Sequence, residues 1–182
     1  FIKSPNTAVA HASAVAMHGQ EALVANPMFA AVLGRPLYQA GVEEAGNAIS
    51  AWTLAVDLSP ETGEPRDGRE WRKYVAGRQF PGSLPVGPAL VTIDELENPG
   101  GMTATIKLNG VATWNGLVCP PTIDCVQRLA DLSQDYAFSP GDVIAFATAH
   151  DSPSSPRHKL SSGDVFSVGL EGVMELGFQL RK

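Results

Sequence analysis

The sequence predicts a mainly β protein of the α+β class, with many turns and few short helices. Glycine and proline are frequent, at 18 and 14 of 182 residues, which favours short elements joined by turns. Apolar residues make up 44% of the chain and charged residues 18%, as in globular rather than disordered proteins. The length fits one domain over residues 1–182.

The first strong signals lie before residue 60. Residues 29–33 are a short apolar run that ends at a glycine and a proline, which is typical of a buried strand. Residues 42–45 are expected to form one or two helical turns with two acidic residues near the start. Residues 49–58 alternate with a period of two, so Trp52 and Asp57 lie on opposite faces of a predicted strand.

The middle of the chain contains one long connection and one clear hairpin. Residues 60–87 are polar and are predicted to connect two strands; connections of this length are usually functional or disordered. Residues 102–116 alternate around Asn109 and Gly110, a pair that favours the tight turn of a β-hairpin.

A helix and two related turns are predicted in the last third. The apolar spacing over residues 120–133 indicates a helix of about four turns, with Thr122 as its N-cap and Asp124 in its first turn. Residues 139–143 and 161–165 share a Ser-x-Gly-Asp-Val pattern that predicts a turn leading into a strand.

Composition disfavours several classes of partner. The formal net charge of −6 disfavours nucleic acid binding, and no apolar stretch approaches the ~20 residues that span a membrane. Cys119 and Cys125 are interpreted as free thiols, so we expect a cytoplasmic protein. The chain begins at Phe1 rather than methionine, and we expect that an amino-terminal segment can precede it.

The histidines and tryptophans are interpreted as ordinary residues. His11 and His18 are expected to be solvated loop residues, and Trp52 and Trp114 are expected to pack in the core. Residues 150–152 read His-Asp-Ser, but adjacent residues rarely converge into a triad and no Gly-x-Ser-x-Gly motif accompanies them. No glycine-rich nucleotide motif occurs, so no nucleotide cofactor is expected.

Short motifs in a common order run along the whole chain, at residues 1–3, 5–7, 31–34, 53–59, 85–88, 109–111, 140–144, 162–164 and 171–176. In this order they resemble the catalytic domain of the fumarylacetoacetate hydrolase family. The resemblance implies a mixed β-roll or barrel-like core, and homo- or hetero-oligomers of family subunits. It also implies a small 2-oxo or dicarboxylic acid substrate.

The family's metal site is degenerate in this sequence. The resemblance implies Mg²⁺ or Mn²⁺ held by a Glu-x-Glu pair and an aspartate, where the cation stabilises an enolate. The Glu-x-Glu positions hold Asn26 and Met28, and only Asp57 matches a ligand. One aspartate is a poor metal site, so metal binding stays open, and a structural turn-capping role for Asp57 is the alternative.

Two further residues match the family's substrate site. Arg78 aligns with an active-site lysine, and the resemblance implies contact with a substrate carboxylate; a solvated surface arginine is the commoner alternative. Thr148 matches the threonine of a Gly-Thr-Pro turn, although both flanking residues differ. The resemblance therefore implies Asp57, Arg78 and Thr148 as catalytic residues.

Three functions remain open. The resemblance favours a decarboxylase or isomerase acting on an unsaturated 2-oxo (2-hydroxydienoic) dicarboxylic acid in aromatic catabolism. The missing glutamates instead favour a non-catalytic subunit that pairs with an active paralogue. A metal-free cyclase or ligand-binding protein is the third alternative.

Overall fold

Two mixed β-sheets and short helices make up the described part of the chain. The computed structural model describes residues 2–61, 68–96, 99–117, 124–147 and 158–182. The first sheet has the order β1 (Ala8–Val9), β5 (Leu84–Thr92), β4 (Ile49–Pro60), β3 (Leu23–Leu33) and β8 (Val143–Ala147), and β9 (His158–Leu160) also pairs with β3. The second sheet has the order β2 (Ala14–Ala16), β11 (Met174–Arg181), β10 (Val165–Leu170), β6 (Thr103–Leu108) and β7 (Val111–Leu117). Because β1–β5 and β2–β11 are parallel and the other pairs are antiparallel, both sheets are mixed.

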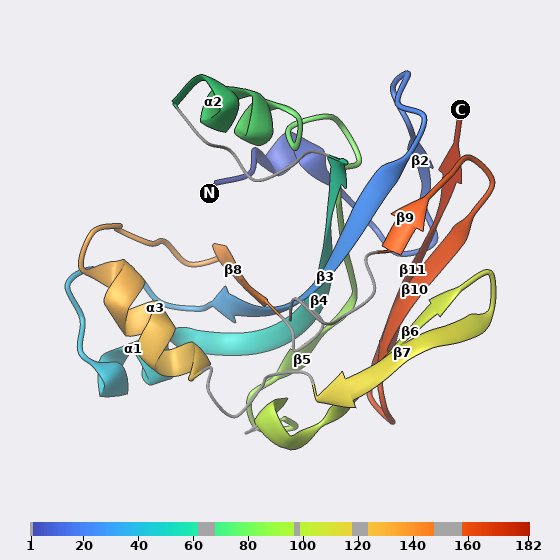
Figure 1. Cartoon of the computed structure of the whole chain (residues 1–182). Helices are drawn as coiled ribbons and strands as arrows, with labels where there is room; N and C mark the ends of the chain where they lie inside the picture. The colour runs from blue at the N-terminus through green and yellow to red at the C-terminus, as the bar shows by residue number, and fades with distance from the viewer. Residues whose placement is uncertain (1, 62–67, 97–98, 118–123, 148–157) are drawn as a thin grey trace.

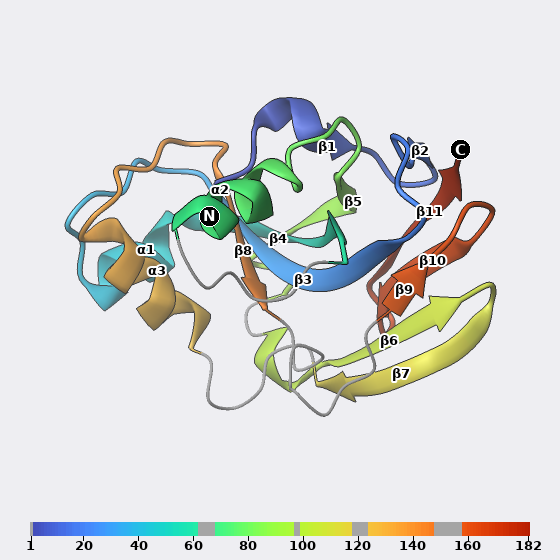
Figure 2. The ribbon, with the colours of Figure 1, turned by 45° about the horizontal axis from the view of Figure 1, so that its top comes forward.

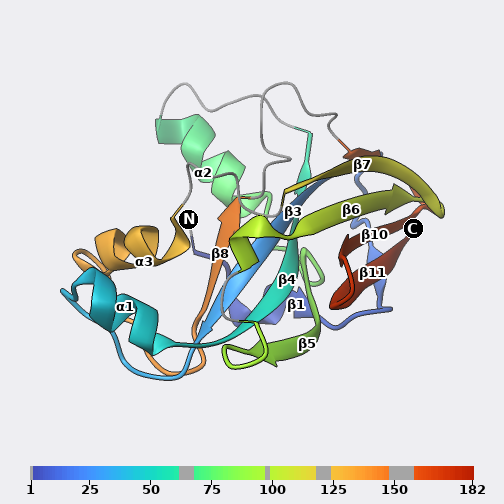
Figure 3. The same ribbon diagram turned by 90° about the horizontal axis from the view of Figure 1, so that it is seen from below.

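The helices lie around the first sheet. They are α1 (Val42–Ala48), α2 (Gly68–Ala76) and α3 (Cys125–Ser133), with 3-10 turns η1 (Pro5–Thr7) and η2 (Pro99–Gly101). Figure 1 shows α1 beside α3 at one end of β3 and β4, and α2 close to the N-terminus; Figure 2 shows the same neighbours from another side. In Figure 3 the second sheet lies at the opposite side of β3 and β4 from α1 and α3. This arrangement confirms the prediction of a mainly β, α+β fold with short helices.

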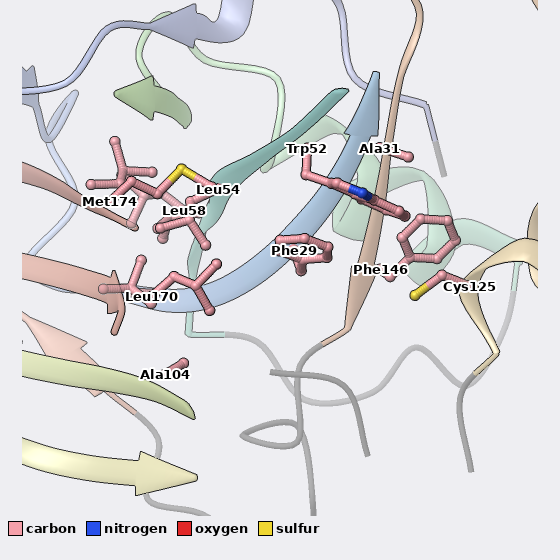
Figure 4. Close-up of a cluster of buried hydrophobic side chains, with 14 of the residues drawn as sticks. Phe29, Ala31, Trp52, Leu54, Leu58, Ala104, Cys125, Phe146, Leu170 and Met174 are labelled. Carbon is pink, nitrogen blue, oxygen red and sulfur yellow. The ribbon is translucent and has the colours of Figure 1, made fainter. Parts of the chain in front are cut away.

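The core forms on one face of the paired strands β3 and β4. Phe29 of β3 stacks on Trp52 of β4, with 4.9 Å between ring centroids. Figure 4 shows this pair near Phe146 and Cys125, while other β4 side chains meet those of the second sheet. Nearly every residue of β4 is buried, on both faces of the strand. Both faces of β4 are therefore covered, and from Ala51 to Ser59 its second face carries small residues and Asp57.

The local turn predictions are confirmed. Asn109 and Gly110 both have positive φ angles, 52° and 80°, as a two-residue hairpin turn between β6 and β7 requires. In the two Ser-x-Gly-Asp turns the aspartate Oδ2 accepts the serine backbone N–H, at 2.8 Å for Asp142 and 2.7 Å for Asp164. These turns lead into β8 and β10 as predicted.

The start of helix α3 was predicted wrongly. Asp124 is its N-cap, since its Oδ1 accepts the backbone N–H groups of Val126 and Gln127 at 2.9 and 3.1 Å. The helix has 9 residues rather than about four turns. Cys125 is buried, whereas Thr122 and Cys119 lie outside the described residues.

The long connection of residues 60–87 contains structure that the sequence did not indicate. It includes α2 and the start of β5, and α2 buries none of its residues. Its three large apolar residues, Trp71, Tyr74 and Val75, follow helical spacing, but the charged residues between them gave the segment the composition of a polar loop. No helix in the described segments is long and apolar enough to cross a membrane.

Candidate active site around Asp57

The strand register brings the family's ligand positions together on one face of the first sheet. Asn26 of β3 lies opposite Asp57 of β4, and Met28 lies opposite Ala55. Residues directly opposite in antiparallel strands point to the same face, so Asn26, Met28 and Asp57 share the face turned away from Trp52. The β9 pairing along β3 ends at Ala25 and the β8 pairing begins at Met28, so β3 changes partner beside these positions.

Asp57 is the centre of a buried charged triad with Lys3 and Arg78. The Lys3 Nζ donates to Asp57 Oδ1 at 2.5 Å, and the Arg78 Nε donates to Asp57 Oδ2 at 3.1 Å. The three side chains are only 6 to 8% exposed. Asp57 therefore binds cations from two distant segments, and the turn-capping interpretation is not supported.

Arg78 is fixed by contacts on both sides of its guanidinium. Its Nη1 donates to the carbonyl oxygen of Tyr74 at 3.1 Å, and its Cζ lies 3.5 Å from the centroid of the Tyr74 ring. Such stacking stabilises a cation whose in-plane Nε–H donates to a carboxylate. The interpretation of Arg78 as a solvated surface residue is wrong, because the residue is buried.

Lys3 was not identified as a site residue from the sequence, although it belongs to a motif that resembles the family. Its ammonium also donates to the carbonyl oxygen of Ser83 at 3.0 Å. An ammonium has three N–H donors, and within the described residues the third has no protein acceptor. Burial lowers the pKa of Lys3, and the Arg78 cation acts in the same direction, whereas Asp57 raises it.

Gln79 holds the segment that carries Lys3. Its Nε2 donates to the carbonyl oxygen of Ile2 at 2.9 Å, and its Oε1 accepts the backbone N–H of Ser4 at 3.0 Å. The backbone is thus tied on both sides of Lys3 by the residue that follows Arg78. The segments that carry Lys3 and Arg78 are therefore joined to each other by hydrogen bonds through Gln79.

The described residues do not fit a Mg²⁺ or Mn²⁺ site. Such cations prefer several oxygen ligands, but the two positions expected to hold glutamates offer an amide and a thioether. Both oxygens of Asp57 already accept hydrogen bonds from cations. In the described part of the chain, no group of three histidine, cysteine or acidic residues is placed to hold a metal ion.

The remaining candidates lie elsewhere. Thr148 follows β8 but falls outside the described residues, as do His150 and Asp151. His11 and His18 are exposed loop residues, as predicted; the His11 Nδ1 accepts the backbone N–H of Gly177 at 3.0 Å. Neither histidine forms part of the triad.

Comparison with known proteins gives a family. The model of the family described as fumarylacetoacetate (FAA) hydrolase C-terminal matches residues 1–181. A 2,4-didehydro-3-deoxy-L-rhamnonate hydrolase of Sphingomonas sp. is 25% identical over 143 residues, covering 77% of this chain and 49% of the relative. An oxaloacetate tautomerase of Bacillus subtilis is 23% identical over 188 residues, covering 99% of this chain and 60% of the relative.

Solved structures share the fold. A probable 2-hydroxyhepta-2,4-diene-1,7-dioate isomerase from Mycobacterium abscessus superposes with a TM-score of 0.84 at 22% identity, covering 100% of this chain and 69% of that chain. The chain spans about half the length of several relatives that it matches, 49% and 51% in two cases. Since the family model covers all but the last residue, the chain belongs to the family described as fumarylacetoacetate (FAA) hydrolase C-terminal.

Proposed function

We propose that this chain acts on a small 2-oxo (2-hydroxydienoic) dicarboxylic acid as an isomerase or decarboxylase. The observation that carries the proposal is the buried Lys3 ammonium, which has one N–H donor without a protein acceptor in the described residues. An ammonium has three N–H donors, and a substrate oxygen would accept the one that Asp57 and Ser83 leave over. Similar proteins named as an oxaloacetate tautomerase and a probable 2-hydroxydienoic diacid isomerase support this substrate class.

The chemistry needs positive charge beside an oxygen atom. Transfer of a proton from the carbon next to a 2-oxo group to solvent water leaves an enolate with its charge on that oxygen; return of a proton from water to another carbon completes an isomerisation. Loss of carbon dioxide from a suitable diacid gives an enolate of the same kind. A fixed N–H donor in a buried site stabilises such an oxyanion. In this proposal Lys3 donates to the oxyanion, and Arg78 contributes charge for a substrate carboxylate.

Asp57 has a positioning role in this scheme. Its two oxygens accept hydrogen bonds from Lys3 and from Arg78, so it fixes both cations relative to each other. The triad carries two positive charges and one negative charge, which favours a bound carboxylate over a cation.

The experiment is hydrogen–deuterium exchange of 2-oxo diacids of four to seven carbons in D₂O, followed by proton NMR at the carbon next to the oxo group. We expect the protein to accelerate exchange for at least one diacid. Lys3→Met should reduce this acceleration by about 100-fold or more, as loss of an oxyanion donor does in other enzymes. Lys107→Met removes an exposed lysine from a surface ion pair and serves as the control, with exchange unchanged. If the protein leaves the exchange rate of every diacid at its value without protein, the proposal is contradicted.

A non-catalytic subunit is the second candidate, and the occupied carboxylate of Asp57 together with Asn26 and Met28 favours it. Native mass spectrometry of the protein mixed with a family subunit that keeps the Glu-x-Glu pair would test it. A stable mixed oligomer, together with no exchange activity of this chain alone, would support the second candidate.

A further inference from the structure

The charged triad occupies the place where the family resemblance implies a metal ion. Asp57 is the one matching carboxylate, and the Lys3 Nζ lies 2.5 Å from its Oδ1. We propose that the Lys3 ammonium replaces the divalent cation, so that the site is charged by a residue of the chain and binds neither Mg²⁺ nor Mn²⁺. This replacement of the ion does not depend on whether the chain is catalytic.

The ligands around Lys3 suit an ammonium rather than a hard divalent cation. Lys3 donates to one carboxylate oxygen and to the carbonyl oxygen of Ser83. An ammonium is a compact charge that needs only a few acceptors, whereas Mg²⁺ demands near-octahedral oxygen coordination. Asn26 offers an amide instead of a carboxylate, and its Nδ2 donates to the backbone oxygen of Asp57 at 3.4 Å.

The chain also holds Lys3 in place independently of Asp57. Gln79 binds the backbone on both sides of Lys3, through Ile2 and Ser4. Thr7 is buried, and its Oγ1 donates to the carbonyl oxygen of Ser4 at 2.6 Å. The Ser83 Oγ in turn donates to the carbonyl oxygen of Arg78 at 2.7 Å, which connects the acceptor of Lys3 with the second cation. A metal ion at Asp57 would have to displace an ammonium that is held by several contacts.

The second cation opposes metal binding as well. The Arg78 Nε lies 3.1 Å from Asp57 Oδ2, so a divalent ion on this carboxylate would lie close to a guanidinium. Like charges at such separations repel strongly even at an effective dielectric constant of about 20. Lys3 and Arg78 therefore both disfavour the binding of a free cation at Asp57.

The test measures Mn²⁺ binding by electron paramagnetic resonance, in which free Mn²⁺ gives the signal, on chelator-treated protein. We expect the intact chain to leave the signal unchanged. If the intact chain reduces the signal of free Mn²⁺ and the Asp57→Asn variant does not, Mn²⁺ binds at Asp57 and the proposal is overturned. This readout requires no substrate, so it fails or succeeds separately from the exchange assay.

Two engineered proteins test the replacement directly. Asn26→Glu with Met28→Glu restores three carboxylates while Lys3 remains, and the same pair with Lys3→Met removes the ammonium. We expect the triple variant to bind Mn²⁺ at least about tenfold more tightly than the double variant. Equal affinities would show that Lys3 does not occupy the cation position and would overturn the proposal.

A third measurement keeps the inference testable if the added glutamates prevent folding. Lys3→Met leaves Asp57 buried with one of its cations lost, and should lower the melting temperature by about 10 °C. Lys107→Met is the matched control, because it makes the same change in an exposed pair, and should lower it by no more than about 2 °C. Equal small shifts would overturn the view that Lys3 supplies the charge that Asp57 requires.

Discussion

Two lysine–carboxylate pairs of this chain differ mainly in burial. In the Lys3–Asp57 pair the side chains are 8% and 6% exposed, whereas in the Lys107–Glu175 pair they are 39% and 46% exposed. Water screens the second pair, and exposed pairs of this kind contribute about 0 to 1 kcal/mol to stability. The first pair has lost its water, so each partner depends on the other. A lysine–carboxylate pair therefore forms a buried charged cluster in one place and a surface contact in the other.

The largest expected effect is the loss of the central carboxylate. Asp57→Ala leaves two cations buried without their shared partner, and should lower the free energy of unfolding by about 3 to 5 kcal/mol. Glu175→Ala removes the corresponding carboxylate of the exposed pair, and should lower it by less than about 1 kcal/mol. Urea unfolding of both variants measures the two values. Similar losses would show that burial does not distinguish the two pairs.

Arg78→Lys separates the effect of charge from that of geometry, because it keeps the charge and changes the geometry. A lysine loses the stacking on Tyr74 and the planar set of donors that reaches both Asp57 and the Tyr74 carbonyl oxygen. We expect a loss of about 1 to 3 kcal/mol. Lys107→Arg, the reverse exchange in the exposed pair, should change stability by less than about 0.5 kcal/mol. A neutral Arg78→Lys variant would mean that charge alone holds the triad together.

The two regions also differ in how far the sequence predicts them. The hairpin beside Lys107 was predicted because its signal is local: alternating residues flank Asn109 and Gly110, whose positive φ angles the turn needs. Asp57 was found from strand alternation and the family resemblance. Its partner Lys3 lies 54 residues away in the sequence, and no local pattern joins two residues so distant.

The burial of Arg78 escaped prediction for a related reason. The segment is rich in charged residues and was interpreted as a polar connection, although Trp71, Tyr74 and Val75 of the preceding helix α2 follow helical spacing. The packing on Tyr74 and Asp57 exists only once α2 and β4 are placed together. The start of α3 shows the same limit on a smaller scale, since threonine and aspartate are both good N-caps and the sequence does not choose between Thr122 and Asp124.

Gln79→Met tests whether exposed hydrogen bonds beside Lys3 help to hold the buried Lys3–Asp57 pair. The substitution removes the hydrogen bonds to Ile2 and Ser4, which are exposed, so the loss of stability should be no more than about 1 kcal/mol. The local effect should be larger, because the Ser4 amide loses its acceptor. Hydrogen exchange should show lost protection at Ser4, with the Leu58 amide, which donates to the Ser83 carbonyl oxygen, unchanged as a control. Unchanged protection at Ser4 would show that Gln79 does not hold the backbone beside Lys3.

The smallest effect concerns the pH dependence of the exposed pair. The Ser167 hydroxyl, which donates to Glu175 Oε1 at 2.6 Å, lowers the pKa of Glu175 below its ordinary value of 4.5, and Lys107 lowers it further. A carboxyl group with a lowered pKa in the folded state stabilises the protein above the unfolded pKa. That contribution is lost as the pH falls through the folded pKa. Because the side chain is nearly half exposed, solvent screening keeps the contribution small.

Glu175→Gln removes this dependence. The difference in unfolding free energy between the original chain and the variant should be under about 1 kcal/mol at pH 7, and should shrink as the pH drops below 4.5. Ser167→Ala removes the main cause of the lowered pKa. As the pH falls, the stabilisation by ionised Glu175 should therefore be lost at a higher pH in this variant than in the original chain. Urea unfolding between pH 3 and pH 7 measures both effects. A difference that grows toward low pH would reverse the sign and would show that Glu175 is not stabilised as an anion.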